Sequence, residues 1–170
     1  MPTRPNIISD AEAYVNGESL TSVDSIELPD ITMMSEEVEQ LGMAGAIEVP
    51  QPHVEAMTTT INFASYNPGD LLLFTPDEAL QIQVFFSISD ITEEGRSEFQ
   101  RLVEMRALFM DRTNDTAERN RDEGPELELA VQYYKEEQDG EALHEVDPQN
   151  SVCKYNGEDL LEERKSNLGR

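Results

Sequence analysis

The stretch VQYYKEEQDGEALHEVDPQNSVCKYNGEDLLEERKSNLGR, residues 131–170, decides the fold class. It contains Asp139-Gly140 and Asn156-Gly157, dipeptides that favour tight β-hairpins because both central residues of a type I′ turn need positive φ. Residues 141–146 are expected to pair back across the first turn, and residues 152–155 to form a last short strand. The chain therefore closes with antiparallel strands.

A helical tail is expected after the second turn. Residues 158–166 place acidic side chains first and basic side chains last, the order that suits the dipole of a short helix.

Upstream, three segments alternate apolar and polar residues as half-buried strands do: residues 54–63, 80–91 and 126–136. Residues 99–110 fit a helix or a strand by periodicity, and we interpret them as a strand that pairs with residues 80–91 across the intervening turn. In the last alternating segment Leu127, Leu129, Val131 and Tyr133 are expected to point inward.

The first thirty residues predict an arm and a hairpin. Residues 1–10 are polar and contain two prolines, so an arm without structure of its own is expected. A hairpin is centred on Asn16-Gly17. Its return strand carries apolar residues in an irregular phase, which indicates a bulge near Asp24-Ser25.

Residues 30–52 are apolar but interrupted by glycine and proline. A loop folded back on its own core is one interpretation; an extended arm for self-assembly is preferred, since methionine adapts to a partner surface. The candidate contacts between subunits are Met33, Met34, Val38, Leu41, Met43, Ile47 and Val49. A short helix with Asp70 near its N-cap is expected within residues 68–74, and residues 111–125 predict a long mobile loop.

Charge is the most unusual global property. The chain has 36 acidic and 12 basic residues, a formal net charge of −24. This charge repels nucleic acid and anionic membranes, so binding of DNA through a basic patch and insertion into a membrane are not expected. An acidic protein that imitates DNA and inhibits a nucleic-acid-binding partner is the alternative that charge alone suggests. Cys153 is the single cysteine, so no intramolecular disulfide is expected.

Motifs of catalysis and metal binding are not found in the sequence. It has no GxSxG, P-loop, GxGxxG, HExxH or CxxC pattern. Residues 111–116 begin like a calcium loop, but Thr116 stands where the turn requires glycine. The sequence therefore predicts no enzyme, no cofactor and no metal site.

Four motifs carry a family resemblance: YVNG at residues 14–17, ELPDI at 27–31, GMAGA at 42–46 and YNGEDLLEERKSNLG at 155–169. In this order the chain resembles the major tail tube proteins of contractile-tailed bacteriophages and phage-tail-like bacteriocins. The resemblance implies a mainly β protein, a single domain over residues 1–170, folded as a two-sheet antiparallel β-sandwich or barrel-like structure with a short flanking helix and long assembly loops.

The resemblance also implies a structural role in a virion. Six subunits would close into a ring, and stacked rings would form a tube that conducts DNA or an effector. The implied partners are further copies of the chain and the tail sheath, tape measure, baseplate and tail terminator proteins, with assembly in the host cytoplasm. A ring of six carries 6 × (−24) = −144 formal charges, and such charge repels a DNA backbone that passes through it.

The strand faces suggest which side chains line that tube. The candidates for the lumen, with an outer face as the alternative, are Gln81, Gln83, Glu126, Glu128, Gln132 and Glu136, together with Ser87 and Ser89.

Overall fold

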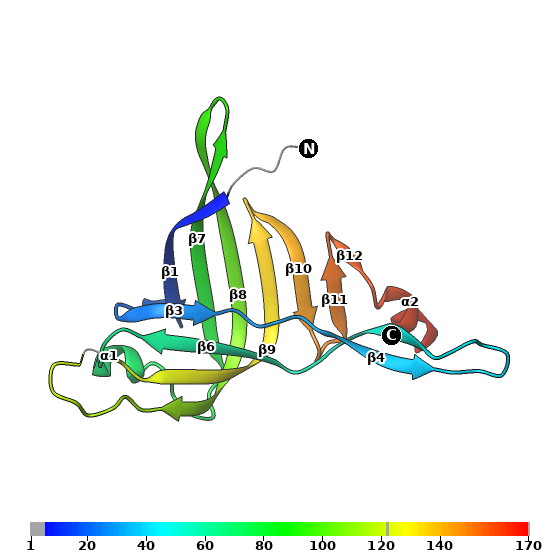
Figure 1. The fold of residues 1–170 in the computed structure, drawn as a ribbon, viewed down its shortest axis with the longest axis horizontal. Helices are drawn as coiled ribbons and strands as arrows, with labels where there is room; N and C mark the ends of the chain where they lie inside the picture. Colours follow the sequence, from blue (N-terminus) through cyan, green and yellow to red (C-terminus); the bar gives the residue numbers. More distant parts are fainter. Residues whose placement is uncertain (1–5, 122, 170) are drawn as a thin grey trace.

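The structure, a computed structural model, describes residues 6–121 and 123–169, and antiparallel strands dominate it (Figure 1). The expectation of a mainly β fold is confirmed. The strands are β1 (Asn6–Val15), β2 (Glu18–Ser19), β3 (Val23–Glu27), β4 (Met33–Val38), β5 (Ile47–Val54), β6 (Met57–Phe63), β7 (Leu80–Thr92), β8 (Gly95–Thr113), β9 (Glu126–Gln138), β10 (Glu141–Asp147), β11 (Val152–Tyr155) and β12 (Glu158–Asp159). The helices are α1 (Pro68–Leu71) and α2 (Glu162–Asn167).

Ten of these strands form one sheet that folds into two layers. The large layer has the order β12-β11-β10-β9-β8-β7-β1-β2. Strand β9 belongs to both layers, because its first half pairs with β6 and its second half pairs with β10. The small layer consists of β3, β6, the first half of β9 and the end of β8 that pairs with it, and Figure 1 shows its strands crossing those of the large layer.

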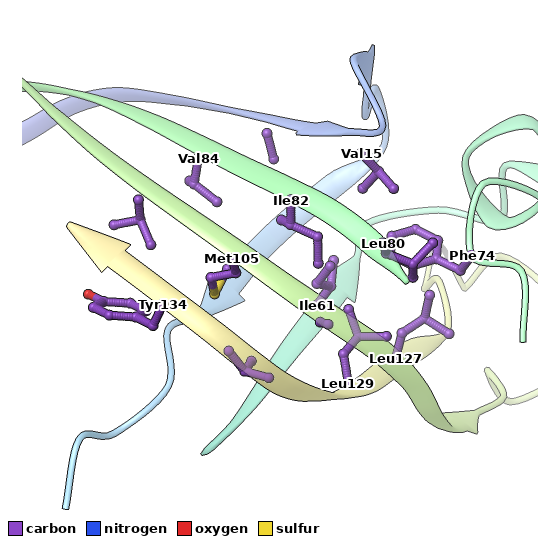
Figure 2. Packing of buried hydrophobic residues seen from close by; sticks show 14 of the residues in the cluster. Val15, Ile61, Phe74, Leu80, Ile82, Val84, Met105, Leu127, Leu129 and Tyr134 are labelled. Atoms are coloured by element: carbon purple, nitrogen blue, oxygen red, sulfur yellow. The ribbon is translucent and has the colours of Figure 1, made fainter. Parts of the chain in front are cut away.

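The core lies between the two layers. One cross-strand row of the large layer runs Val15, Ile82, Met105, Tyr134 and Val146, and all five side chains are buried. The small layer contributes side chains that face this row in Figure 2; they include Ile61, Leu127 and Leu129. Each fully buried aliphatic or aromatic side chain stabilises the fold by about 1.5–3 kcal/mol. The burial of this row therefore determines which face of the large layer points to the core.

A β-bulge at Gln132 separates the two halves of β9. Val131 pairs with Ala107 but Tyr133 pairs with Arg106, so Gln132 is the extra residue. An inserted residue moves every following side chain to the opposite face. The prediction that Tyr133 points inward is therefore wrong: Tyr134 is buried at 3 % exposure and Tyr133 points away from the core.

The N-terminal region confirms the hairpin and corrects the arm. Asn16 and Gly17 have φ of 51° and 84° in the turn between β1 and β2. Residues 6–10, predicted to lack structure, belong to β1 and pair with β7, while residues 1–5 lie outside the described residues. The bulge expected in the return segment is present at Asp24, but this segment is β3, which pairs with β6.

The helical predictions need two corrections of their bounds. Helix α1 begins after Asn67, whose side chain accepts a hydrogen bond from the Gly69 N–H, so Asn67 and not Asp70 is the N-cap. Asp70 lies inside the helix and is buried. Helix α2 covers only part of the predicted tail, because residues 158–159 pair with β11 as strand β12.

Two predictions concern strand β8 and the loop that follows it. Residues 99–110 lie within β8, as interpreted, and residues 99–107 pair with β7. The predicted loop at residues 111–125 is shorter than expected, because residues 111–113 continue β8 and Pro125 is buried. Gly124 packs on Phe63, where a Cβ atom would lie 2.5 Å from the Phe63 carbonyl oxygen.

Candidate assembly surfaces

The segment predicted as an extended assembly arm is a β-hairpin. Strands β4 and β5 pair with each other in a sheet of two strands that projects from the body of the molecule (Figure 1). The glycines and prolines were expected to interrupt a long strand here, yet Pro50 and Pro52 both lie within β5. An isolated two-stranded ribbon is at best marginally stable in water. The hairpin therefore depends on contacts beyond its own pairing.

One face of this hairpin carries mainly aliphatic side chains, with Glu36 opposite Val49, and the other face pairs two carboxylates. Val38 lies opposite Ile47, and Val49 shares their face. On the other face Glu37 lies opposite Glu48, a destabilising pair of like charges. The candidate contact residues that are exposed large hydrophobics are Met34, Leu41, Met43 and Ile47, and those that are half-buried are Met33, Val38 and Val49.

The base of the hairpin is held by the C-terminal helix. Arg164 of α2 contacts the His53 ring and donates from Nη2 to Gln51 Oε1 at 3.5 Å. At the tip, Leu41 beyond β4 is fully exposed. The hairpin is therefore anchored at one end and free along its apolar face.

A second surface is the side of the large layer that faces away from the core, called here the uncovered face. A cross-strand row of polar side chains crosses it, and its last five members alternate between negative and positive charge. The row is Tyr14, Gln83, Glu104, Lys135, Glu145, Lys154 and Asp159. Opposite charges on neighbouring strands stabilise the pairing.

Hydrogen bonds and ion pairs along the row connect its charged side chains. Gln83 Nε2 donates to Glu104 Oε1 at 2.9 Å, and Lys154 Nζ lies 3.2 Å from Glu145 Oε2. Lys135 contacts Glu137 from the adjacent row. The Glu137 carboxylate, with Glu104 and Glu145 farther off, raises the pKa of Lys135. The cations of this face are thus bound by carboxylates of the same chain.

The six candidate lumen residues do not share one face. Gln81 and Gln83 lie on the uncovered face, where Gln81 pairs with Arg106. Glu126 and Glu128 lie on the outer side of the small layer, beside β6. Gln132 occupies the bulge.

Glu136 lies on the core side, because the bulge reverses the second half of β9. Its carboxylate accepts hydrogen bonds from Arg101 Nε at 2.6 Å and from the Tyr134 hydroxyl at 3.1 Å. Ser87 and Ser89, the further candidates, share the uncovered face of β7, where Ser89 is 2 % exposed and accepts a hydrogen bond from Arg96 Nε. The expectation that Glu136 shares a face with Glu126 is wrong.

The sheet has an open edge at β1. The residues of this strand that precede Ala13 pair with β7 on one side, and among the described residues no strand pairs with them on the other side. An unpaired edge presents backbone N–H and C=O groups to another chain.

The described part of the chain has neither a metal-binding cluster nor a membrane-spanning helix. Residues 6–121 and 123–169 contain no group of three or more His, Cys, Asp or Glu placed to hold a metal ion. Over the same residues, no helix has the length and apolar character needed to cross a membrane.

Comparison with known proteins identifies the family. The family model described as phage tail tube protein FII matches residues 5–169, nearly the whole chain. The chain belongs to the phage tail tube protein FII family. The resemblance to tail tube proteins is thereby confirmed. No curated protein matches the chain.

Solved structures share the fold of this tail tube family member at low identity. One is a chain of the PVC extracellular contractile injection system described as the sheath/tube terminator in its extended state. It matches with a TM-score of 0.57 and 14% identity, and the match covers 81% of this chain and 99% of that chain. A chain of the PVC sheath-tube complex gives a TM-score of 0.55 at 14% identity, covering 78% and 91%. A chain of the anti-feeding prophage tube-terminating cap gives 0.51 at 14% identity, covering 75% and 87%.

Proposed function

We propose that the chain is the major tail tube subunit of a contractile particle, that six copies close into a ring, and that stacked rings form a tube. The observation that carries this proposal is the open edge of β1 in a member of the tail tube family. A sheet edge of this length invites pairing with another chain, and closure of six sheets into one barrel removes it.

In this arrangement the uncovered face lines the bore. Gln81 and Gln83 are then lumen residues, as is the row of alternating charges. DNA binds proteins through free lysine and arginine side chains. Because Lys135 and Lys154 are held by carboxylates, the bore offers passing DNA few cations, and the net charge of −24 per subunit repels it. An effector protein is the other cargo that such a bore conducts.

The β4–β5 hairpin is then the arm that joins neighbouring subunits or rings. Its apolar face, with Ile47 at 52 % and Met34 at 50 % exposure, becomes buried on a further copy of the chain. The loop at residues 114–121, exposed throughout, is a second candidate for such contacts. The tail sheath, tape measure, baseplate and tail terminator proteins complete the particle, which assembles in the host cytoplasm.

Negative-stain electron microscopy of the purified chain tests this function. We expect rings about one subunit thick, or tubes of stacked rings. A chain that remains monomeric or dimeric at high concentration and binds a basic partner tightly at low salt would instead support the acidic DNA mimic.

A further inference from the structure

An apolar strip interrupts the uncovered face. Next to the row of alternating charges runs the row Glu12, Phe85, Leu102 and Glu137, so two hydrophobic side chains lie side by side between two carboxylates. The Tyr14 ring packs edge-on against Phe85, with 5.7 Å between ring centroids. Tyr14, Phe85 and Leu102, all half-buried, are called here the aromatic patch. Core packing does not explain it, since these side chains point away from the core.

Two shallow hollows flank Phe85. One, of about 320 Å³, is lined by Asp10, Glu12 and Phe85 among others, and the second, of about 480 Å³, by Glu12, Tyr14 and Phe85 among others. Both hollows are thus bounded by Phe85 on one side and by the exposed Glu12 on the other. Each combines an aromatic wall with an adjacent negative charge, which suits an apolar side chain next to a cationic one.

The charge around the aromatic patch is negative. Glu12 and Glu104 border it on β1 and β8, and Asp10 lies one row away. Lys135, the cross-strand neighbour of Glu104, contacts Glu137, so the carboxylates around the aromatic patch outnumber its cations. A partner with positive charges on both sides of an apolar group is complementary to this arrangement.

We propose that the aromatic patch binds a basic amphipathic helix of a second protein. Strands β1 and β8 are separated by β7, and Glu104 lies two residues along β8 from Leu102, which is in the row of Glu12. Glu12 and Glu104 therefore lie about 12 Å apart. Basic residues at positions i and i+7 of a helix lie on the same face at about 10.5 Å. The long side chains of these basic residues reach both carboxylates, and an apolar residue at i+4 then falls between them, beside Phe85. If the uncovered face lines a bore, which rests on the proposed function, this helix belongs to a protein carried inside the tube.

A dye-labelled synthetic helix tests the proposal on the full chain. The probe is an alanine-based peptide with Lys, Leu and Lys at i, i+4 and i+7, and fluorescence anisotropy gives its dissociation constant. Phe85→Thr and the double variant Glu12→Gln with Glu104→Gln should each weaken binding by about tenfold or more, as truncation of a central contact does. The matched controls are Tyr66→Thr, an exposed aromatic elsewhere, and Glu126→Gln with Glu128→Gln on the small layer.

The results separate specific binding from general attraction. Equal affinity in all variants would show attraction to the net charge alone and would overturn the proposal, as would undetectable binding to the unaltered chain. A probe with Glu in place of Lys, or Ser in place of Leu, should bind at least about tenfold more weakly. Should Phe85→Thr fail to fold by circular dichroism, the double glutamine variant, altered only in exposed or half-buried carboxylates, decides the outcome.

Electron microscopy of the same variants distinguishes this proposal from the tube itself. Tubes should form in all of them. Tubes combined with unaltered peptide affinity in Phe85→Thr would overturn only the helix site, whereas peptide binding without tubes would overturn only the proposed function. Loss of tubes in Phe85→Thr would show that a second copy of the chain occupies the patch, and the helix proposal would be wrong.

Discussion

At the scale of single residues, the buried carboxylate of Asp70 joins α1 to the segment between β2 and β3. It accepts hydrogen bonds from the Ser22 N–H at 2.8 Å, the Ser22 hydroxyl at 2.7 Å and the Thr21 N–H at 3.0 Å. Burial alone would raise the pKa of Asp70, but these hydrogen bonds outweigh it and lower the pKa below its ordinary value. The ionised carboxylate is thus part of the fold.

The Asp70→Asn variant should therefore be less stable by about 1–3 kcal/mol at neutral pH, because an amide cannot accept all of these donors. A lowered pKa in the folded state contributes stability above the unfolded pKa, which is lost as pH falls through the folded value. Urea unfolding should show a difference in the free energy of unfolding between the two proteins at pH 7, and this difference should shrink below about pH 4. A constant difference from pH 7 to pH 3 would contradict this role of Asp70.

Tyr134 gives a second prediction at this scale. Burial, followed by the nearby Glu136 carboxylate, raises its pKa to about 12. Because the raised pKa favours the neutral phenol in the folded state, this contribution to stability is complete below the unfolded pKa of about 10 and is lost as pH rises towards 12. When tyrosine ionisation is followed by ultraviolet absorbance, the titration curves of the unaltered chain and of Tyr134→Phe should differ near pH 12. A difference centred near pH 10 would mean that Tyr134 is exposed.

At the scale of elements, the bulge at Gln132 decides which faces β9 presents. Deleting Gln132 would place both halves of β9 in one continuous register with β8, so either Leu129 or Tyr134 would turn out of the core. We therefore expect the deletion variant not to fold cooperatively. Gln132→Ala keeps the residue count and should change the free energy of unfolding by less than about 1 kcal/mol. Urea unfolding followed by circular dichroism compares the two. Cooperative unfolding of the deletion variant near the wild-type midpoint would show that the bulge does not set the faces.

The β4–β5 hairpin provides the second prediction at this scale. Among the described residues it pairs only with itself and is anchored at its base, so deletion of residues 33–49 should leave a soluble, folded subunit that no longer assembles. Size-exclusion chromatography and negative-stain microscopy check both parts. Tubes formed by the shortened chain would show that the hairpin is not the assembly arm.

The same elements show how far the sequence predicts the structure. The Asx-Gly turns were found because positive φ at those positions has a residue preference, and Asn16, Asp139 and Asn156 all have positive φ. The bulge at Gln132 has no comparable residue preference, so the sequence did not predict it. The position of Glu136 on the core side, which follows from the bulge, was missed for the same reason. The row of alternating charges was missed because it joins residues of seven strands through their register, which no local pattern contains.

At the scale of the whole molecule, charge opposes assembly. Each subunit contributes −24, so neighbouring subunits repel one another at low ionic strength. Raising ionic strength from about 0.01 M to about 0.15 M shortens the Debye length from about 30 Å to about 8 Å. The concentration needed for tube formation, measured by light scattering, should therefore fall over this range. Sucrose at equal osmolarity is the control, and a threshold that rises with salt would indicate that ion pairs between subunits dominate assembly.

The orientation of the subunit within the particle is the central structural claim. Electron cryomicroscopy of the assembled chain measures it most directly. We predict hollow six-membered rings in which Gln81, Gln83 and the row from Glu104 to Lys154 face the bore, with the β4–β5 hairpin seated on a neighbouring subunit. A tube with this face turned outward, or a chain that stays single with its hairpin packed on its own body, would contradict the account.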